Sequence, residues 1–145
     1  MAMGIPAATT ANETGLTIVN PPNLYDPSPH GYSTAVITPC EARLAYISGQ
    51  GGQDSRGALS PDFAVQVEQA YANLRAALEG IGARPDQVAK LTVFVVDHDM
   101  SKLEVLTRTV KEMFGEALPA QTLIPVPRLA VDGMLFEVEA VAVLP

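Results

Sequence analysis

The spacing of apolar residues along the chain predicts two helices. Between residues 60 and 82, apolar side chains recur at intervals of three and four, which places them on one helix face. They are Phe63, Val67, Ala70, Tyr71, Leu74, Ala77, Leu78 and Ile81. Ser60 suits the N-cap of this helix and Pro61 its first position. Gly80 and Gly82 supply its end.

A second apolar stripe follows Ser101, whose spacing to Glu104 is that of a capping box. The members of this stripe are Leu103, Leu106, Val110, Met113 and Phe114, with Gly115 after them. Because each helix has a single apolar stripe, we expect each to cover a sheet with that face.

Segments rich in β-branched residues predict the strands. They are Thr17–Asn20, Ser33–Thr38, Arg43–Ser48, Val88–Val96, Gln121–Val126 and Met134–Leu144. The segment 39–42 is short enough to close a hairpin between the second and third strands. Prolines around and inside Gln121–Val126 place that strand at an edge or a bulge. Prolines in 21–32 and glycines in 49–57 indicate loops.

The predicted order is β-β-β-α-β-α-β-β. It favours an α+β fold, a two-layer sandwich with both helices on one face of a mostly antiparallel six-stranded sheet. Residues 17–145 form the single domain, and residues 1–16, which show no periodicity, form a flexible tail. Val88–Val96 and Met134–Leu144 are apolar on both faces, so the face opposite the helices needs a cover. A second copy of the chain is the expected cover.

Composition narrows the class of protein. Only 17% of the 145 residues are charged, against roughly 25% in a typical soluble domain, which favours self-association. The formal net charge of −7 argues against nucleic acid as a partner. Cys40 is the single cysteine, which fits a reducing compartment, and no signal-peptide pattern is present. The apolar runs are far shorter than the ~18 residues of a membrane span. We therefore expect a cytoplasmic protein without membrane or nucleic-acid partners.

Glu137 and Glu139 are the first candidates for chemistry. On a strand they point to the same face as Val143, the face expected to meet another subunit. A carboxylate half-buried there has a raised pKa and can act as a general acid or base. Alternatively, both carboxylates lie at the rim in water or pair with Arg128 or Arg43.

The turn at Ser48, Gly49 and Gln50 is a second candidate. Free backbone N–H groups at such a glycine turn can bind a carboxylate or an oxyanion, although an ordinary β-turn is the alternative. Neither common glycine-rich phosphate motif occurs. The Asp-His-Asp segment at 97–99 has no further ligand at metal-binding spacing, and Cys40 has no histidine near it in sequence. We therefore predict no metal and no cofactor.

Five segments resemble, in order and spacing, those of the RidA (YjgF) family. They are Tyr46–Gln50 (YISGQ), Gln69–Leu74 (QAYANL), Val88–Val95 (VAKLTVFV), Pro119–Thr122 (PAQT) and Phe136–Ala140 (FEVEA). The similarity covers residues 17–145. It implies a chorismate-mutase-like fold and a homotrimer with ligand sites in the clefts between subunits. It also implies hydrolysis of reactive 2-imino acids, or their enamine tautomers, to 2-keto acids and ammonia.

The resemblance also implies roles for individual residues. Tyr32 matches the tyrosine of an N-terminal G-P-Y segment that shapes the pocket. Ser48, Gly49 and Gln50 match the S-G-Q turn, whose backbone amide lines the site. Glu137 matches the glutamate that holds the attacking water.

Three positions depart from the family pattern. Gln121 replaces the arginine that clamps the substrate carboxylate in a P-A-R-[ST] motif. A neutral amide cannot give that bidentate, charge-assisted contact, and its loss of about 1.5–3 kcal/mol corresponds to tens- to hundredfold weaker binding of an anion. Leu123 stands at a pocket position often held by cysteine, and Thr107 at that of a helix asparagine.

The sequence therefore predicts a RidA-like trimeric hydrolase or deaminase that acts on an imine, enamine or related metabolite. Gln121 would hydrogen-bond a neutral or amide-like group, so efficient 2-iminopropanoate hydrolysis is not expected. The alternative is a non-catalytic trimer that binds a small metabolite. An endoribonuclease is less favoured because the chain is acidic.

Overall fold

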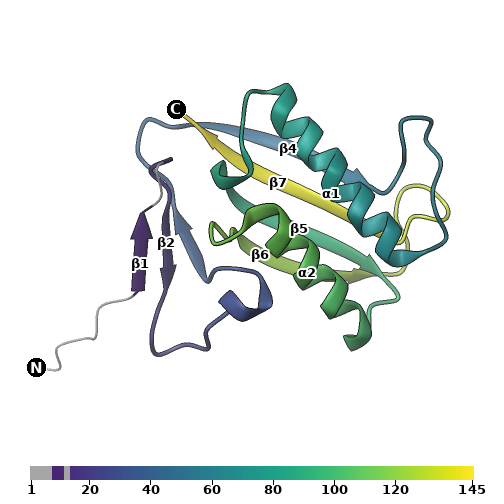
Figure 1. The fold of residues 1–145 in the computed structure, drawn as a ribbon, viewed down its shortest axis with the longest axis horizontal. Coiled ribbons are helices and arrows are strands. Elements are labelled where there is room, and N and C mark those ends of the chain that lie inside the picture. Colours follow the sequence, from purple (N-terminus) through teal and green to yellow (C-terminus); the bar gives the residue numbers. More distant parts are fainter. Residues whose placement is uncertain (1–7, 12–13) are drawn as a thin grey trace, which may run out of the picture.

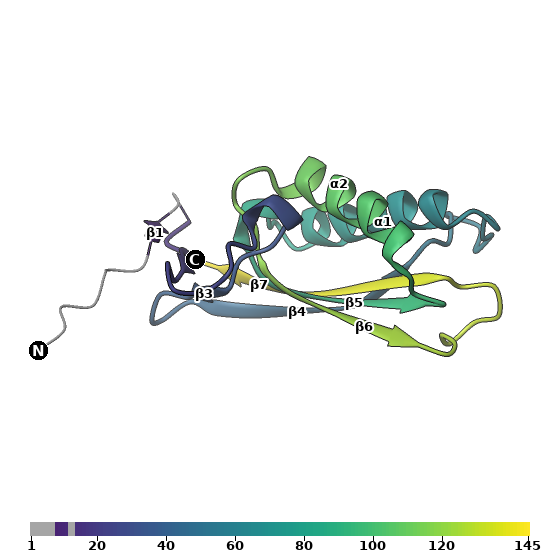
Figure 2. The ribbon, with the colours of Figure 1, turned by 90° about the horizontal axis from the view of Figure 1, so that it is seen from below.

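The chain forms a layer of two helices packed on a four-stranded sheet, with a three-stranded sheet at one end (Figure 1). The computed structural model describes residues 8–11 and 14–145. The strands are β1 (Ala8–Ala11), β2 (Thr17–Asn20), β3 (Ala35–Ile37), β4 (Arg43–Gly51), β5 (Val88–Val96), β6 (Ala120–Val126) and β7 (Phe136–Leu144). The helices are α1 (Phe63–Gly80) and α2 (Leu103–Phe114), with 3-10 turns at Ser28–His30, Pro85–Gln87 and Met100–Lys102. Both helices lie on the same side of the larger sheet, which confirms the two-layer α+β prediction (Figure 2).

The strands do not form the single six-stranded sheet that the sequence predicted. The orders are β1-β2-β3 in the small sheet and β4-β7-β5-β6 in the large one, and only β5 and β6 pair in parallel. The predicted hairpin at 39–42 is wrong, because β3 pairs with β2 while β4 pairs with β7. Glu41, at a φ of 69°, turns the chain from one sheet to the other.

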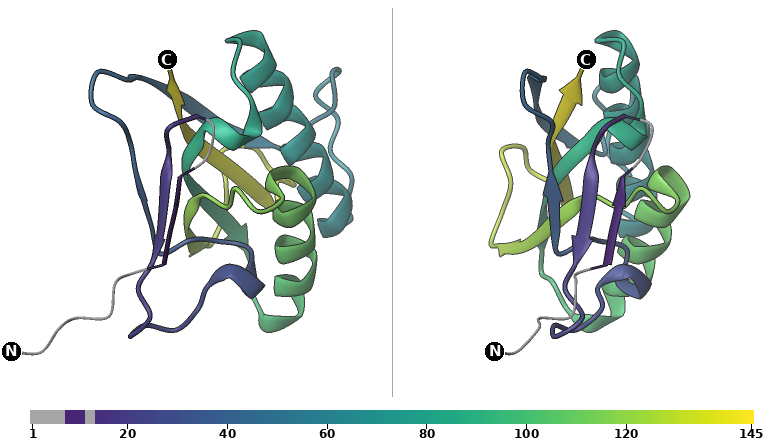
Figure 3. Two further views of the ribbon diagram at one scale, coloured as in Figure 1. Left: turned by 60° about the vertical axis from the view of Figure 1, so that its left-hand side comes forward. Right: turned by 90° about the vertical axis from the view of Figure 1, so that its left-hand side faces the viewer.

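The N-terminal segment contributes a strand where the sequence predicted no regular element. β1 runs antiparallel to β2, with Ala8 opposite Asn20, and the short strands stand together at one end of the large sheet (Figure 3). The residues of β1, Ala-Thr-Thr-Ala, are small and show no apolar periodicity. The strand is therefore recognised only from its backbone pairing with β2. Of the predicted tail over 1–16, residues 1–7 and 12–13 lie outside the described residues.

A small second core joins this N-terminal sheet to the rest of the chain. Leu16, which is 2% exposed, packs with Ala89 and Val143, and Val36 flanks them. Val143 is on the sheet face turned away from the helices, as the sequence predicted, but there it is covered by its own chain rather than by another subunit.

The main core lies between the helices and the inner face of β5 and β7. Every second residue of β7 points into it, namely Phe136, Val138, Ala140 and Ala142. Tyr71 of α1 stacks on Phe136 with 5.8 Å between ring centroids, and Phe63 meets the same ring edge-on at 6.3 Å. The predicted stripe of α1 is confirmed except at Ile81, which lies beyond the helix and is 44% exposed.

Both helix starts differ from the sequence prediction. Asp62, rather than Ser60, caps α1, and its carboxylate accepts the backbone N–H of Val65 at 3.0 Å. Asp99 caps the 3-10 turn Met100–Lys102 that leads into α2, whereas α2 itself begins after Lys102 without a side-chain cap. The carboxylate of Asp99 accepts the hydroxyl of Ser101 and, at 2.8 Å, its backbone N–H, and these bonds lower the pKa of Asp99. A carboxylate is a charged and therefore stronger acceptor than a serine hydroxyl, which favours Asp62 and Asp99 as caps.

One polar side chain is fully buried at the start of α1. The Nε2 of Gln66 donates to the carbonyls of Ser60 and Gly133, both at 2.7 Å, and its Oε1 accepts the N–H of Leu135 at 2.9 Å. Gly52 packs so closely on the backbone of Gln66 that a Cβ there would lie 2.7 Å from it. The amide thus ties α1 to the segment before β7, and the glycine ties α1 to the end of β4.

The sheet face turned away from the helices is open within the described part of the chain (Figure 2). The register places Leu44 and Tyr46 of β4 opposite Val143 and Val141, and hence on this face. Leu44 is 47% exposed and Tyr46 is 77% exposed, and Ile124 of β6 adds a further exposed apolar side chain. Such a group of apolar side chains favours burial against another protein surface.

Replacing Gln66 by leucine tests the role of this amide. Gln66→Leu leaves two carbonyls and one N–H buried without partners, so we expect the free energy of unfolding to fall by about 2–4 kcal/mol. Urea unfolding at one fixed protein concentration measures the change. Glu79→Leu, on the exposed side of the same helix, is the control and should change stability by less than about 0.5 kcal/mol. An unchanged unfolding midpoint for Gln66→Leu would contradict the assignment.

Candidate functional site

The glycine turn belongs to the end of β4 rather than to a separate loop. The pairing of β4 with β7 shifts register between Ile47 and Gln50, so Ser48 and Gly49 form a bulge. The Nε2 of Gln50 donates to the carbonyl of Ser48 at 3.0 Å. The bulge bends the strand at the point where it meets the first half of β7.

Glu137 of β7 lies directly against Gly49. A Cβ on Gly49 would come within 1.7 Å of the Oε1 and 2.8 Å of the Cγ of Glu137, so only glycine leaves the carboxylate its place. Glu137 is half-buried. The cations proposed as its partners are engaged elsewhere, because Arg128 binds Asp132 at 2.8 Å and Arg43 donates to the last backbone carbonyl. The carboxylate has no ion-pair partner among the described residues.

A hollow of about 870 Å³ opens beside Glu137, and we call it the Glu137 hollow. Its walls are the segment 49–55, one side of α1 and the segment 130–134. Asn73 of α1 holds the first wall, since its Nδ2 donates to the carbonyls of Gly51 at 2.9 Å and Gln53 at 2.8 Å. Gln69 in turn donates to the Oδ1 of Asn73 at 2.9 Å. These bonds give a structural role to two residues of the family-like segment Gln69–Leu74.

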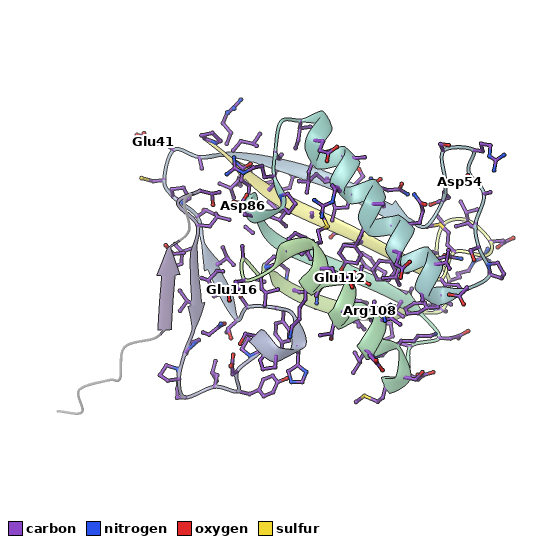
Figure 4. All side chains as sticks on the ribbon, in the orientation of Figure 1. Glu41, Asp54, Asp86, Arg108, Glu112 and Glu116 are labelled. Atoms are coloured by element: carbon purple, nitrogen blue, oxygen red, sulfur yellow. The ribbon has the colours of Figure 1, made fainter. Side chains whose placement is uncertain are left out.

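Asp54 stabilises the outer part of this wall. Its carboxylate accepts the backbone N–H groups of Ala58 and Arg56, each at 2.9 Å, and these bonds lower the pKa of Asp54. Figure 4 shows Asp54 on the loop that leads from β4 to α1. This carboxylate is therefore used by its own loop and is not a candidate for chemistry.

The remaining predicted site residues line a different pocket, of about 360 Å³, which we call the Gln121 pocket. It lies between β6, α2 and the segment 25–32. Tyr32, Thr107, Gln121 and Leu123 all contribute to its wall. The other lining residues are Tyr25, His30, Tyr71, Val93, Leu103, Leu106 and Thr122.

Strand pairing explains why Gln121 and Leu123 face this pocket. β6 runs parallel to β5 with Gln121 beside Leu91 and Leu123 beside Val93. Leu91 and Val93 point into the core beneath the helices, so their neighbours on β6 point to the same side. β6 is the edge strand of the sheet, which leaves its side chains at the margin of the core.

The segment 25–32 closes the pocket because it packs tightly on α2. Gly31 has a φ of 85°, and a Cβ there would lie 2.4 Å from Val110. The hydroxyl of Thr107 donates to the carbonyl of His30 at 3.3 Å. At the mouth, the rings of Tyr25 and His30 lie 5.2 Å apart. Partial desolvation, and then the neighbouring Tyr32, raise the pKa of Tyr25.

The predicted site residues therefore fall into two groups within one chain. Gly49, Gln50 and Glu137 line the Glu137 hollow, while the four residues around Gln121 line the other pocket. Ser48 is exposed and lines neither of them. The position of Glu139, exposed on the open sheet face, is also apart from both groups.

The sequence did not predict the hydrogen bonds of Gln66 and Asn73, nor the position of Tyr71 beside the Gln121 pocket. Gln66 interrupts the apolar stripe of α1 with a polar side chain, which was the available signal. The spacing of Tyr71 predicts its place in the core, which the structure confirms, but it gives no indication of the pocket beside the ring.

The described residues contain no group of three or more His, Cys, Asp and Glu side chains arranged to hold a metal ion. His98 is half-buried with an Nδ1 that has no partner there, and Cys40 is exposed. None of the described helices is both long and apolar enough to span a membrane.

Together, the fold and these two hollows define a small α+β domain with candidate ligand sites at the margins of its sheet. Residues 26–144 match the family model described as Endoribonuclease L-PSP. The chain belongs to this family, which is the RidA (YjgF) family that its motifs resembled.

Individual relatives agree with this assignment. A RutC family protein of Pyrococcus horikoshii is 33% identical over 119 residues, which are 80% of this chain and 90% of that protein. The 2-iminobutanoate/2-iminopropanoate deaminase of Salmonella typhimurium is 33% identical over 104 residues, covering 69% of this chain and 79% of that protein. The crystal structure of YyfB from Yersinia pestis, a protein of unknown function in the conserved Rid family, superposes with a TM-score of 0.85 at 32% identity. This superposition covers 89% of this chain and 98% of that one.

Gly49→Ala tests the contact between Gly49 and Glu137. The new Cβ displaces the carboxylate, and because the end of the glutamate side chain can swing away, we expect a loss of stability of no more than about 1 kcal/mol. A crystal structure of the variant shows the displacement directly. Gly80→Ala, where a Cβ meets nothing within 4 Å, is the control and should leave Glu137 in place. An unmoved Glu137 in Gly49→Ala would contradict the close packing described above.

Proposed function

We propose that this protein is a homotrimeric, RidA-type hydrolase that acts on a small imine or enamine in clefts between its subunits. In this proposal the Glu137 hollow of one subunit meets the Gln121 pocket of its neighbour. The single observation that carries the proposal is the division of the site-like residues between two separate hollows of one chain. A second copy, packed against the open sheet face with Leu44 and Tyr46, supplies the missing half.

The chemistry assigned to Glu137 is general acid–base catalysis. The substrate enters as the protonated imine, and the carboxylate accepts a proton from water as the water oxygen bonds to the imine carbon, which gives a neutral carbinolamine. The proton held by Glu137 then passes to the amine nitrogen. As the carbon–nitrogen bond breaks and ammonia leaves, the carboxylate accepts the hydroxyl proton, which gives the carbonyl product, and it then releases this proton to the departing ammonia. The backbone beside Gly49 stabilises developing negative charge, and Tyr32 closes the cleft. The deaminase name of the Salmonella relative supports this reaction type.

Gln121 changes the expected substrate. A glutamine side chain offers no charge to a substrate carboxylate, so 2-iminopropanoate and 2-iminobutanoate are expected to be poor substrates. Leu123 makes the same wall apolar. A trimer that binds a small metabolite without catalysis is the second candidate, and the same lack of a cation supports it.

The name Endoribonuclease L-PSP suggests RNA cleavage, which the charges of this chain disfavour. Arg108 lies between Glu68 at 3.6 Å and Glu112 at 3.9 Å (Figure 4). Arg56, Arg84 and Arg128 also pair with aspartates close to them in sequence. The net charge of −7 and these pairings among the described residues therefore disfavour binding to a phosphate backbone.

The oligomeric state is tested by light scattering. We expect a mass close to three times the chain mass of 15.3 kDa. Tyr46→Glu places a charge on the open sheet face and should shift the mass toward that of one chain. Val65→Glu, which introduces the same charge at an exposed apolar residue of α1, should leave the mass unchanged. A wild-type mass near 15.3 kDa would refute the trimer.

The substrate prediction is tested with 2-iminopropanoate generated by an amino-acid oxidase. Wild type should accelerate its decay weakly, and Gln121→Arg should raise the rate by about ten- to a hundredfold, because arginine restores a charge-assisted bond. Glu137→Ala in the Gln121→Arg background should abolish that gain.

Each alternative result has a clear meaning. A wild-type rate equal to that of an arginine-containing family member would refute the claim about Gln121. If neither wild type nor Gln121→Arg hydrolyses any imine tested, the non-catalytic binding function replaces the hydrolase.

A further inference from the structure

We propose that Tyr71 is a ligand-binding residue of the Gln121 pocket, and that Tyr71 and Gln121 together select a neutral ligand that carries a carboxamide or similar N–H group on an apolar body. The inference deepens the proposed function. It rests on the placement of the ligand in this pocket but not on hydrolysis.

Tyr71 is a buried tyrosine whose hydroxyl has no partner. The side chain is 4% exposed, stacks on Phe136 and meets Phe114 edge-on with 6.5 Å between centroids. Its burial raises the pKa of Tyr71, and no described residue hydrogen-bonds to it. The hydroxyl is not among the fully buried polar atoms that lack a partner, so it is accessible to water or to a ligand although the rest of the side chain is buried.

Tyr71 lines two hollows, one on each side of it. The base of the side chain is on α1, beside the outer groove between the helices that Glu68 and Arg75 also line. The same tyrosine lines the Gln121 pocket together with Val93 of β5, on the sheet side of the helix layer. The ring therefore lies between the two hollows, and we infer that its hydroxyl, the end farthest from α1, reaches the Gln121 pocket.

Gln121 places a second unsatisfied group in the same pocket. Its Oε1 is buried and has no hydrogen-bond partner among the described residues. A carbonyl oxygen accepts hydrogen bonds, and a tyrosine hydroxyl can both donate and accept. A primary or secondary amide satisfies both groups at once, because its N–H donates to Gln121 and its carbonyl accepts from Tyr71.

The rest of the lining excludes a charged ligand. No Asp, Glu, Lys or Arg belongs to it among the described residues, and His30 is exposed at its mouth. Lys90 lines a neighbouring hollow instead and donates to the hydroxyl of Thr122 at 2.8 Å. A carboxylate that enters the pocket loses its hydration and finds no cation there, so its desolvation costs free energy. An uncharged amide has a much smaller desolvation cost. The leucines and the tyrosine rings then surround the apolar body of the ligand.

The test compares benzamide with benzoate, two probes of nearly the same shape that differ in charge. Titrations followed by ligand-observed NMR measure the affinity of each probe for the intact protein. We expect benzamide to bind wild type at least about tenfold more tightly than benzoate. Equal affinities, a preference for benzoate, or no binding of either probe at millimolar concentration would overturn the inference.

Two substitutions and one control locate the effect. Tyr71→Phe keeps the ring and removes the hydroxyl, so benzamide should bind about three- to tenfold more weakly. Gln121→Arg should reverse the preference toward benzoate. Tyr46→Phe removes a hydroxyl on the open sheet face from a residue that is not part of the pocket lining, and it should change neither affinity. Unchanged benzamide binding by a folded Tyr71→Phe protein overturns the role of Tyr71. If that variant does not fold, the response of Gln121→Arg still decides the ligand class.

The inference and the proposed function can be refuted independently of each other. A preference for benzamide without hydrolysis of any imine supports the inference and removes the hydrolase. Imine hydrolysis by a protein that prefers benzoate keeps the hydrolase and overturns the inference.

Discussion

The buried amide of Gln66 is the contact on which the site geometry depends. Its three hydrogen bonds fasten the start of α1 to the backbone just before β7, and Glu137 follows only two residues after the last of these bonds. The close approach of Gly52 to the same helix turn fixes the end of β4, where Gly49 lies. The carboxylate and the glycine that it rests against are thus positioned from one point of α1. A fully satisfied polar group in a core imposes this kind of exact register, whereas apolar contacts alone tolerate sliding.

The two hollows differ in the chemistry that they offer. The Glu137 hollow is open, with amides, backbone groups and one free carboxylate around it. The Gln121 pocket is smaller, and its walls combine aromatic and aliphatic side chains with polar groups but no Asp, Glu, Lys or Arg among the described residues. The first is suited to holding water and moving protons, and the second to binding an organic group. A site built from both would separate binding from proton transfer, and each half would come from a different copy of the chain.

Much of the fold was predictable because it follows from local patterns. The stripes of α1 and α2 and the alternation along β7 are each visible in a single segment. The split into two sheets was not predictable, because it depends on the strands with which β3 and β4 pair. The sequences of β3 and β4 are equally compatible with a hairpin between them. The helix starts differed from prediction because a serine and an aspartate, both good caps, lie two residues apart at each start, and the sequence does not show which one accepts the helix N–H. The residue types of the site followed from family motifs, but their division between two hollows is a tertiary property that no motif encodes.

The replacement of arginine by Gln121 is consistent with the rest of its surroundings. Arginine there would need a desolvated counter-charge, and the lining provides apolar side chains and an unpaired Tyr71 hydroxyl instead. The long-range field acts in the same direction, since a chain of net charge −7 repels a small anion at distances up to the Debye length of about 8 Å. Local and global electrostatics therefore agree in disfavouring carboxylates. If Gln121 were an isolated substitution in an otherwise cationic pocket, the lining and the net charge would not agree in this way. We therefore attribute the replacement of arginine to a different ligand rather than to loss of the site.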